Sequence, residues 1–270
     1  MAYRNILLTE AADVVTLTFN RPHALNALTT DMLAETIEAV DRLRDEVQAG
    51  TSRARVLVIT GAGRAFCSGA DLASGSASSE GGSASADMGA RLETHFNPLL
   101  ERLYALPLPI ICAVNGPAAG AGCSLALAGD IVIAAESAYF LLAFVNIGLV
   151  PDVGVTWALP RLIGKARAQA MMMLGDKIPA ATALDWGMIH AVASNDELGL
   201  TVDRLSARLA NGPTQSYVLI RHGLRACLDV PLTQALHIER QHQRLAGRTA
   251  DFAEGVTAFL QKRAAKFRGR

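Results

Sequence analysis

The chain is 270 residues long and carries 25 Lys and Arg against 25 Asp and Glu, so its formal net charge is zero at pH 7. This length allows a sizeable apolar core, and the neutral balance argues against a nucleic-acid partner. Four cysteines without the paired spacing of a metal site predict buried thiols in a reducing compartment, and hence a cytoplasmic protein with no metal centre. The N-terminus shows no signal-peptide pattern.

Apolar runs in the first hundred residues predict strands that alternate with helices. Residues 5–9 and 14–19 are β-prone runs about a turn apart and predict a hairpin, and residues 56–60 predict a buried strand. Between the second and third of these runs, a helix with an apolar stripe is expected from Thr30 and Asp31 onward. Residues 73–90 are rich in Ser, Gly and Ala and predict a loop, which an amphipathic helix over 92–106 follows.

The central stretch, residues 103–129, contains no charged residue. Its length would suit a membrane helix, but three prolines and the Asn115-Gly116 pair interrupt it. The stretch therefore predicts a buried strand over 110–114, a turn and a core helix, with no membrane segment. The run Gly120-Ala121-Gly122 begins that helix. Such small residues either open the first helix amides to a polar ligand atom or simply allow close helix packing.

The second half of the chain repeats the order strand, strand, helix. Short β segments are expected at 131–134 and 139–140, and a helix that ends near residue 186 leads to a last strand at 191–193. From Leu198 onward the pattern is helical, and residues 251–254 are arranged like a capping box that would open a helix over 255–267. We therefore predict an α/β fold with a core over residues 1–200 and a helical C-terminal region over residues 201–270.

Four motifs follow one another along the chain: Asn20-Arg21-Pro22 with Asn26-Ala27-Leu28, residues 64–72, residues 115–130, and Gly148-Leu149-Val150-Pro151-Asp152. Together they resemble the crotonase family, the enoyl-CoA hydratase and isomerase superfamily. The resemblance covers nearly the whole chain, and the set is very specific. It implies a spiral of repeated ββα units. The last motif is similar to that of the 1,2-epoxyphenylacetyl-CoA isomerases and the enoyl-CoA isomerases.

The resemblance implies an acyl-CoA substrate, with coenzyme A as part of the substrate and no separate cofactor. The backbone amides of Ala70 and Ala121 would donate hydrogen bonds to the thioester oxygen and stabilise an enolate. The C-terminal helices would form a homotrimer or a dimer of trimers, in which the last helix often contacts the coenzyme A of a neighbouring subunit. The positions that match the family's substrate site are Ala24, Ser68, Gly69, Asp71, Leu72, Ser124, Phe144, Phe259 and Lys262.

The proton-transferring residues depart from the hydratase pattern. Hydratases of this family hold a water between two glutamates, and the matching positions here are Ser124 and Phe144. Asp152 remains, at the place where related isomerases carry a single acidic residue. One carboxylate suffices to move a double bond, so Asp152 is the predicted acid/base. An apolar neighbourhood should raise its pKa; the residues expected to form it are Phe140, Phe144, Val145 and Val150.

Alternatives remain at this point. Asp152 is the nucleophile if the chain resembles the dehalogenases or hydrolases of the same superfamily. An Asp that follows a Pro is also common in turns and at helix N-caps, where its role is structural. A non-catalytic acyl-CoA binding protein would also lack the two glutamates. The loop over 73–90 is either a cover of the active site or an idle surface insertion.

Overall fold

The computed structural model describes residues 3–72 and 87–270. Of the loop predicted over 73–90, residues 73–86 lie outside the described residues. Residues 88–90 are helical, because helix α3 spans Met88–Arg91 and its first amides bind the side chain of Asp87. A π-helical turn, η3 (Leu92–Phe96), and helix α4 (Asn97–Ala105) continue the predicted helix.

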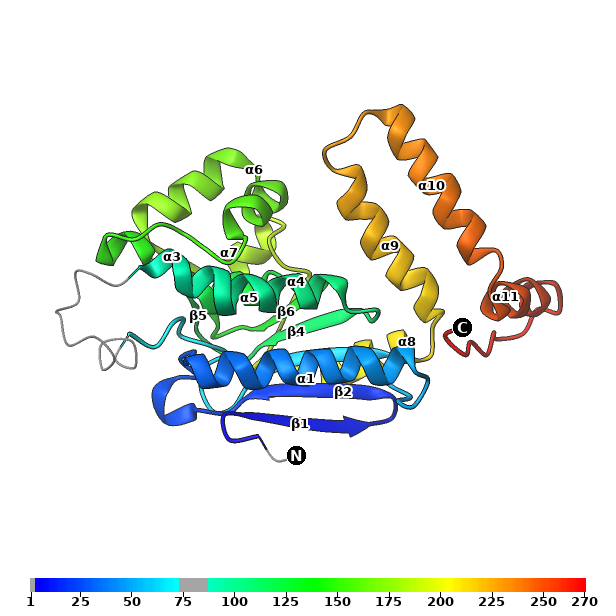
Figure 1. The fold of residues 1–270 in the computed structure, drawn as a ribbon, viewed down its shortest axis with the longest axis horizontal. Coiled ribbons are helices and arrows are strands. Elements are labelled where there is room, and N and C mark those ends of the chain that lie inside the picture. Colours follow the sequence, from blue (N-terminus) through cyan, green and yellow to red (C-terminus); the bar gives the residue numbers. More distant parts are fainter. Residues whose placement is uncertain (1–2, 73–86) are drawn as a thin grey trace.

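A six-stranded sheet lies at the centre of the molecule, in the order β1-β2-β3-β4-β6-β9 (Figure 1). β1 and β2 form the predicted antiparallel hairpin, whose two-residue turn, Ala12 and Asp13, has positive φ angles of 51° and 63°. All the other neighbours are parallel. The strands are β1 (Ile6–Ala11), β2 (Val14–Phe19), β3 (Val56–Gly61), β4 (Ile110–Val114), β6 (Ile131–Ala135) and β9 (Ala191–Ala193).

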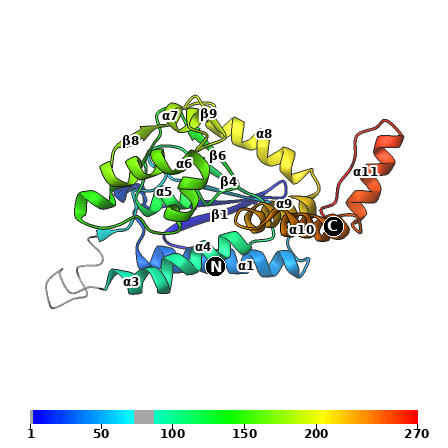
Figure 2. The same ribbon diagram turned by 90° about the horizontal axis from the view of Figure 1, so that it is seen from above.

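Helices cover both faces of this sheet (Figure 2). α1 (Thr30–Gln48) and α4 lie on one face, and α8 (Leu198–Ala210) packs against the strands from the other. Parallel strands covered on both sides must be apolar throughout, and every residue of β4 is buried. α1 begins where predicted, since the Thr29 hydroxyl accepts a hydrogen bond from the Met32 amide.

A second sheet has three short strands in the order β5-β7-β8. Its first strand leads into the small-residue helix. β5 (Ala118–Ala119) directly precedes α5 (Ala121–Ala126), and β7 (Tyr139–Leu141) directly precedes the turn η4 (Ala143–Ile147). The other elements of residues 1–200 are α6 (Val155–Leu174), β8 (Lys177–Pro179) and α7 (Ala180–Asp185), with the short turn η1 (Pro22–Ala24) near the N-terminus.

Three helices form the end of the chain, so the predicted α/β fold with a helical C-terminal region is confirmed. α9 (Thr214–Cys227) and α10 (Leu232–Ala246) pack as a hairpin that projects from the body, and α11 (Ala250–Leu260) follows (Figure 1). The helix predicted over 255–267 was placed wrongly, because Thr249 is the N-cap. The Asp251 carboxylate instead accepts hydrogen bonds from the amides of Arg268 and Gly269 and fastens the C-terminal tail.

Residues 3–72 and 87–270 contain neither a membrane-spanning helix nor a cluster of metal ligands. No helix there is both long and apolar enough to cross a bilayer. Nor do three or more His, Cys, Asp or Glu side chains gather there in a way that would hold a metal ion. The cytoplasmic location expected from the cysteine pattern stays a prediction.

Candidate active site

The small-residue stretch brings the start of α5 against a second loop of the chain. Gly120 precedes the helix with φ 51° and ψ −129°, a conformation that glycine tolerates and other residues avoid. Its amide donates to the Leu141 carbonyl across 2.8 Å. Gly122 has no room for a side chain, because an added Cβ would collide with the Cys67 carbonyl oxygen. α5 can therefore pack this closely against the loop at residues 67–71 only because residue 122 is a glycine.

The two amides predicted to form an oxyanion hole lie at this junction. The loop is anchored by the Ala119 amide, which donates to the Cys67 carbonyl at 2.8 Å. A Cβ added to Gly69 would lie 3.5 Å from the Ala121 nitrogen, so the residue before Ala70 borders the start of α5. Within the described residues, the amides of Ala70 and Ala121 donate to no protein acceptor. Each of these two amides is therefore free to donate to a ligand.

Asp152 has an unpartnered carboxylate oxygen beside α5. Its Oδ1 is buried and has no hydrogen-bond partner among the described residues. Burial raises the pKa of Asp152 to about 6, from an ordinary value of 3.8. The predicted rise in pKa is confirmed, with burial as its cause, but two of the four apolar residues expected around Asp152 are themselves exposed. Val145 and Val150 are 41% and 78% exposed, whereas Phe140 and Phe144 are buried.

Ser124 and Phe144, which stand where hydratases carry glutamates, both lie at this junction. The Ser124 hydroxyl donates to the Asp152 backbone carbonyl at 3.0 Å. The ring of Phe144 comes within 3.9 Å of a Cβ added to Gly120. The fold thus brings two open amides, a hydroxyl, an aromatic ring and the backbone of Asp152 together at α5.

The first motif supports the loop of the oxyanion donor rather than the reacting atoms. Arg21 forms an ion pair with Asp71 at 2.9 Å, so the Asp71 carboxylate ties the loop to the first motif. Asn26 is fully buried, and its side chain donates to the carbonyls of Ala62 and Ala65. Sequence reasoning missed this anchoring role of Arg21 and Asn26. A buried polar residue in a turn-rich motif is the signal that points to it.

The other predicted substrate contacts are divided between two regions. The Ser68 hydroxyl donates to the Ala24 carbonyl at 3.4 Å, so these two residues are neighbours, and Leu72 is exposed. Phe259 is 82% exposed in the last turn of α11, and Lys262 lies in the turn just after that helix. α11 lies at one end of the molecule, well away from α5 in the body (Figures 1 and 2). One chain therefore does not bring Phe259 and Lys262 to Asp152.

Comparison with known proteins identifies the family. Residues 9–270 match the family model described as enoyl-CoA hydratase/isomerase. The chain belongs to this family. It is 46% identical to the 1,2-epoxyphenylacetyl-CoA isomerase of Escherichia coli K12, over 95% of both chains. It is 36% identical to the 2,3-dehydroadipyl-CoA hydratase of the same organism, over 98% of this chain and 99% of that one.

A solved structure agrees with the crotonase fold predicted for this enoyl-CoA hydratase/isomerase family member. The crystal structure of the Bacillus anthracis enoyl-CoA hydratase matches with a TM-score of 0.88 at 30% identity, over 99% of this chain and all of that one. The family acts on coenzyme A thioesters, so the chain is an enzyme of this class. Its relatives include both isomerases and hydratases.

Proposed function

We propose that this protein is an acyl-CoA isomerase that shifts a double bond, or rearranges a ring-epoxide thioester, with Asp152 as its single acid/base. The observation that carries this assignment is the buried, unpartnered Oδ1 of Asp152, on a carboxyl whose pKa is raised to about 6. A carboxylate with such a pKa is both a stronger base than a solvated one and able to return its proton near neutral pH.

The reaction needs a place for negative charge as well as a base. When Asp152 removes a proton from one carbon of the acyl chain, the electrons spread onto the thioester oxygen as a dienolate. The amides of Ala70 and Ala121 would donate to that oxygen, and losing one such donor typically raises the barrier by about 3–4 kcal/mol. Asp152 then returns the proton to another carbon, so no proton is gained or lost. Coenzyme A takes part only as a portion of the substrate.

The residues near Asp152 favour isomerisation over hydration. Adding water to a double bond requires one group that positions the water and another that exchanges a proton with carbon. At the two positions where hydratases carry glutamates, this chain has a hydroxyl already bound to a carbonyl, Ser124, and an apolar ring, Phe144. Neither group can accept a proton from water at neutral pH. The relative named as an isomerase agrees with this choice.

The test is a coupled assay of the wild type and Asp152→Asn with 3-enoyl-CoA and 2-enoyl-CoA, which follows double-bond migration and water addition separately. We expect migration without hydration, an acid limb of kcat/KM near pH 6, and loss of migration in the Asn variant. A ring-epoxide thioester is assayed in parallel. Hydration by the wild type contradicts the assignment. A covalent adduct on Asp152, found by mass spectrometry with a haloaroyl-CoA, would instead make it a nucleophile, and binding without turnover a non-catalytic protein.

We also propose that the protein is a homotrimer or a dimer of trimers assembled through its C-terminal helices. The support is a set of large apolar side chains that one chain leaves exposed on α9, α10 and α11, since such patches mark interaction surfaces. Light scattering should give three or six times the chain mass of 28.5 kDa. A monomer would contradict this. The exposed residues are Ile220, Leu224, Leu228, Leu232, Leu236, Phe259 and Leu260.

A further inference from the structure

The Ser124 hydroxyl donates a hydrogen bond to the backbone carbonyl of Asp152. Ser124 is only 3% exposed, and its Oγ lies 3.0 Å from the Asp152 carbonyl oxygen. The carbonyl of Gly120, the residue just before α5, is farther away at 3.5 Å. A serine hydroxyl within a helix usually bonds back to its own helix. Here the shorter contact leaves α5 and reaches the segment that carries Asp152.

The two residues that follow Asp152 have a left-handed backbone conformation, which surrounding contacts must stabilise. Val153 and Gly154 have φ angles of 52° and 72°, and the left-handed region is unfavourable for a β-branched residue such as valine. Val153 is buried. The Val155 amide, at the start of α6, also donates to the Asp152 carbonyl at 3.3 Å. This carbonyl is thus bound from α5 and from α6, at the start of a strained turn.

We propose that Ser124 is a positioning residue, which aims the Asp152 carboxylate at the substrate by holding the Asp152 carbonyl on α5. The same helix presents the Ala121 amide, one turn before Ser124. This hydrogen bond therefore links the backbone that carries the base to the helix that carries one oxyanion donor. This inference rests on the proposed isomerase function and adds a role for the residue that replaces a hydratase glutamate.

The pKa of Asp152 provides a readout that does not depend on turnover. Burial is the sole cause of its rise to about 6, and no charged group among the described residues contributes to it. If the carbonyl loses its bond to α5, the carboxylate can turn toward water. Its pKa then falls toward the ordinary value of 3.8. The carbonyl keeps the Val155 amide as a partner in such a variant, so we expect the variant to fold.

The test compares Ser124→Ala with the matched control Ser206→Ala in the full-length protein. Ser206 is 4% exposed, and its hydroxyl donates to the Asp203 carbonyl at 3.1 Å in α8, away from the site. A carbon-13 NMR titration follows the Asp152 carboxyl, assigned by its absence from Asp152→Asn. We expect a lower Asp152 pKa in Ser124→Ala only. There, kcat for double-bond migration should fall about 10- to 100-fold with KM little changed, since small misplacements of a catalytic group have effects of this size.

Two results would overturn this role of Ser124. One is a wild-type pKa and a wild-type kcat in Ser124→Ala. The other is an unchanged Asp152 pKa with kcat and melting temperature lowered equally in both serine variants, which indicates a general loss of stability. If the wild type moves no double bond, the isomerase function fails, while the titration still decides whether Ser124 positions Asp152.

Discussion

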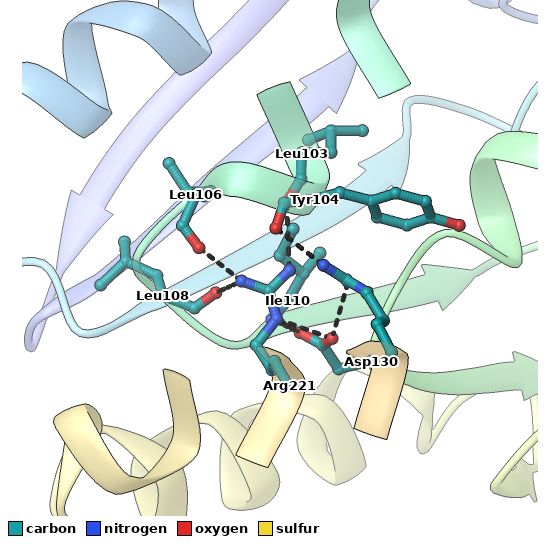
Figure 3. Close-up of polar contacts among 8 residues, drawn as sticks. Leu103, Tyr104, Leu106, Leu108, Ile110, Asp130 and Arg221 are labelled. Carbon is teal, nitrogen blue, oxygen red and sulfur yellow. Dashed lines mark hydrogen bonds and ion pairs between the residues drawn. The ribbon is translucent and has the colours of Figure 1, made fainter. Parts of the chain in front are cut away.

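The guanidinium Nε of Arg221 lies 2.7 Å from Oδ1 and 2.6 Å from Oδ2 of Asp130, in a pair that joins α9 to the sheet (Figure 3). Arg221 is 5% exposed, and its other nitrogens donate to the carbonyls of Leu103, Leu106 and Leu108. Asp130 also accepts from the Ile110 amide at the start of β4. One buried arginine thus fastens the C-terminal helices to the segment between α4 and β4.

Replacing Arg221 should destabilise the protein strongly. Arg221→Met leaves three backbone carbonyls and the Asp130 carboxylate without their main partner, and breaking such a buried pair typically lowers the free energy of unfolding by about 3–5 kcal/mol. Urea denaturation measures the change. Arg161→Met is the control, because the Arg161–Asp229 pair is exposed and should contribute less than about 1 kcal/mol. Equal effects of the two variants would contradict this role of Arg221.

Asp152→Asn should make the protein more stable at neutral and alkaline pH while it removes activity. The folded-state pKa, about 6, lies above the ordinary value of 3.8, so the folded chain holds the proton more tightly than the unfolded chain. The resulting penalty grows as the pH rises from 4 through 6 and is complete above 6, at about 1–3 kcal/mol. Denaturation at pH 8 and pH 4 measures it. A stability difference that is the same at both pH values contradicts a raised pKa.

Gly122→Ala should damage both folding and catalysis. The new Cβ would meet the carbonyl oxygen, Cβ and Sγ of Cys67, so α5 and the Ala70 loop must move apart. Overpacking of this kind typically lowers the free energy of unfolding by about 1–3 kcal/mol, and the separated amides should reduce kcat. Gly199→Ala is the control. It lies in α8 with open space around it and should be neutral or stabilising by up to about 1 kcal/mol. Retained wild-type kcat in Gly122→Ala would show that the junction tolerates a side chain.

One cysteine of the four should react in the native protein. Burial raises the pKa of Cys67, Cys112 and Cys123 to about 12, so their thiolates are scarce and inaccessible. Cys227, in α9, is partly exposed. Ellman's reagent should therefore modify one thiol per native chain and all four in guanidinium. Mass spectrometry after peptide digestion identifies the site. Modification of Cys123 before Cys227 would show that α5 opens readily.

Most of the fold follows from local patterns, and its one misplaced helix shows where they fail. The buried strand at 110–114 is a continuous apolar run between chain breakers, a signal that depends on neighbouring residues alone. Residues 251–254 satisfy the local pattern of a capping box equally well. The Asp251 carboxylate is nevertheless occupied by two amides 17 and 18 residues away. A long-range contact overrode the local preference.

The sequence by itself determined the family, the α/β fold and Asp152 as the one carboxylate at the expected place, because residue identity and order suffice for motifs and for periodic burial. Only the tertiary structure decided how Asp152 is buried, that Ser124 holds its carbonyl from 28 residues away, and that Arg221 binds Asp130 across 91 residues. Burial and hydrogen-bond geometry depend on which distant segments meet. A carboxylate therefore acquires its pKa and its direction only when the chain has folded.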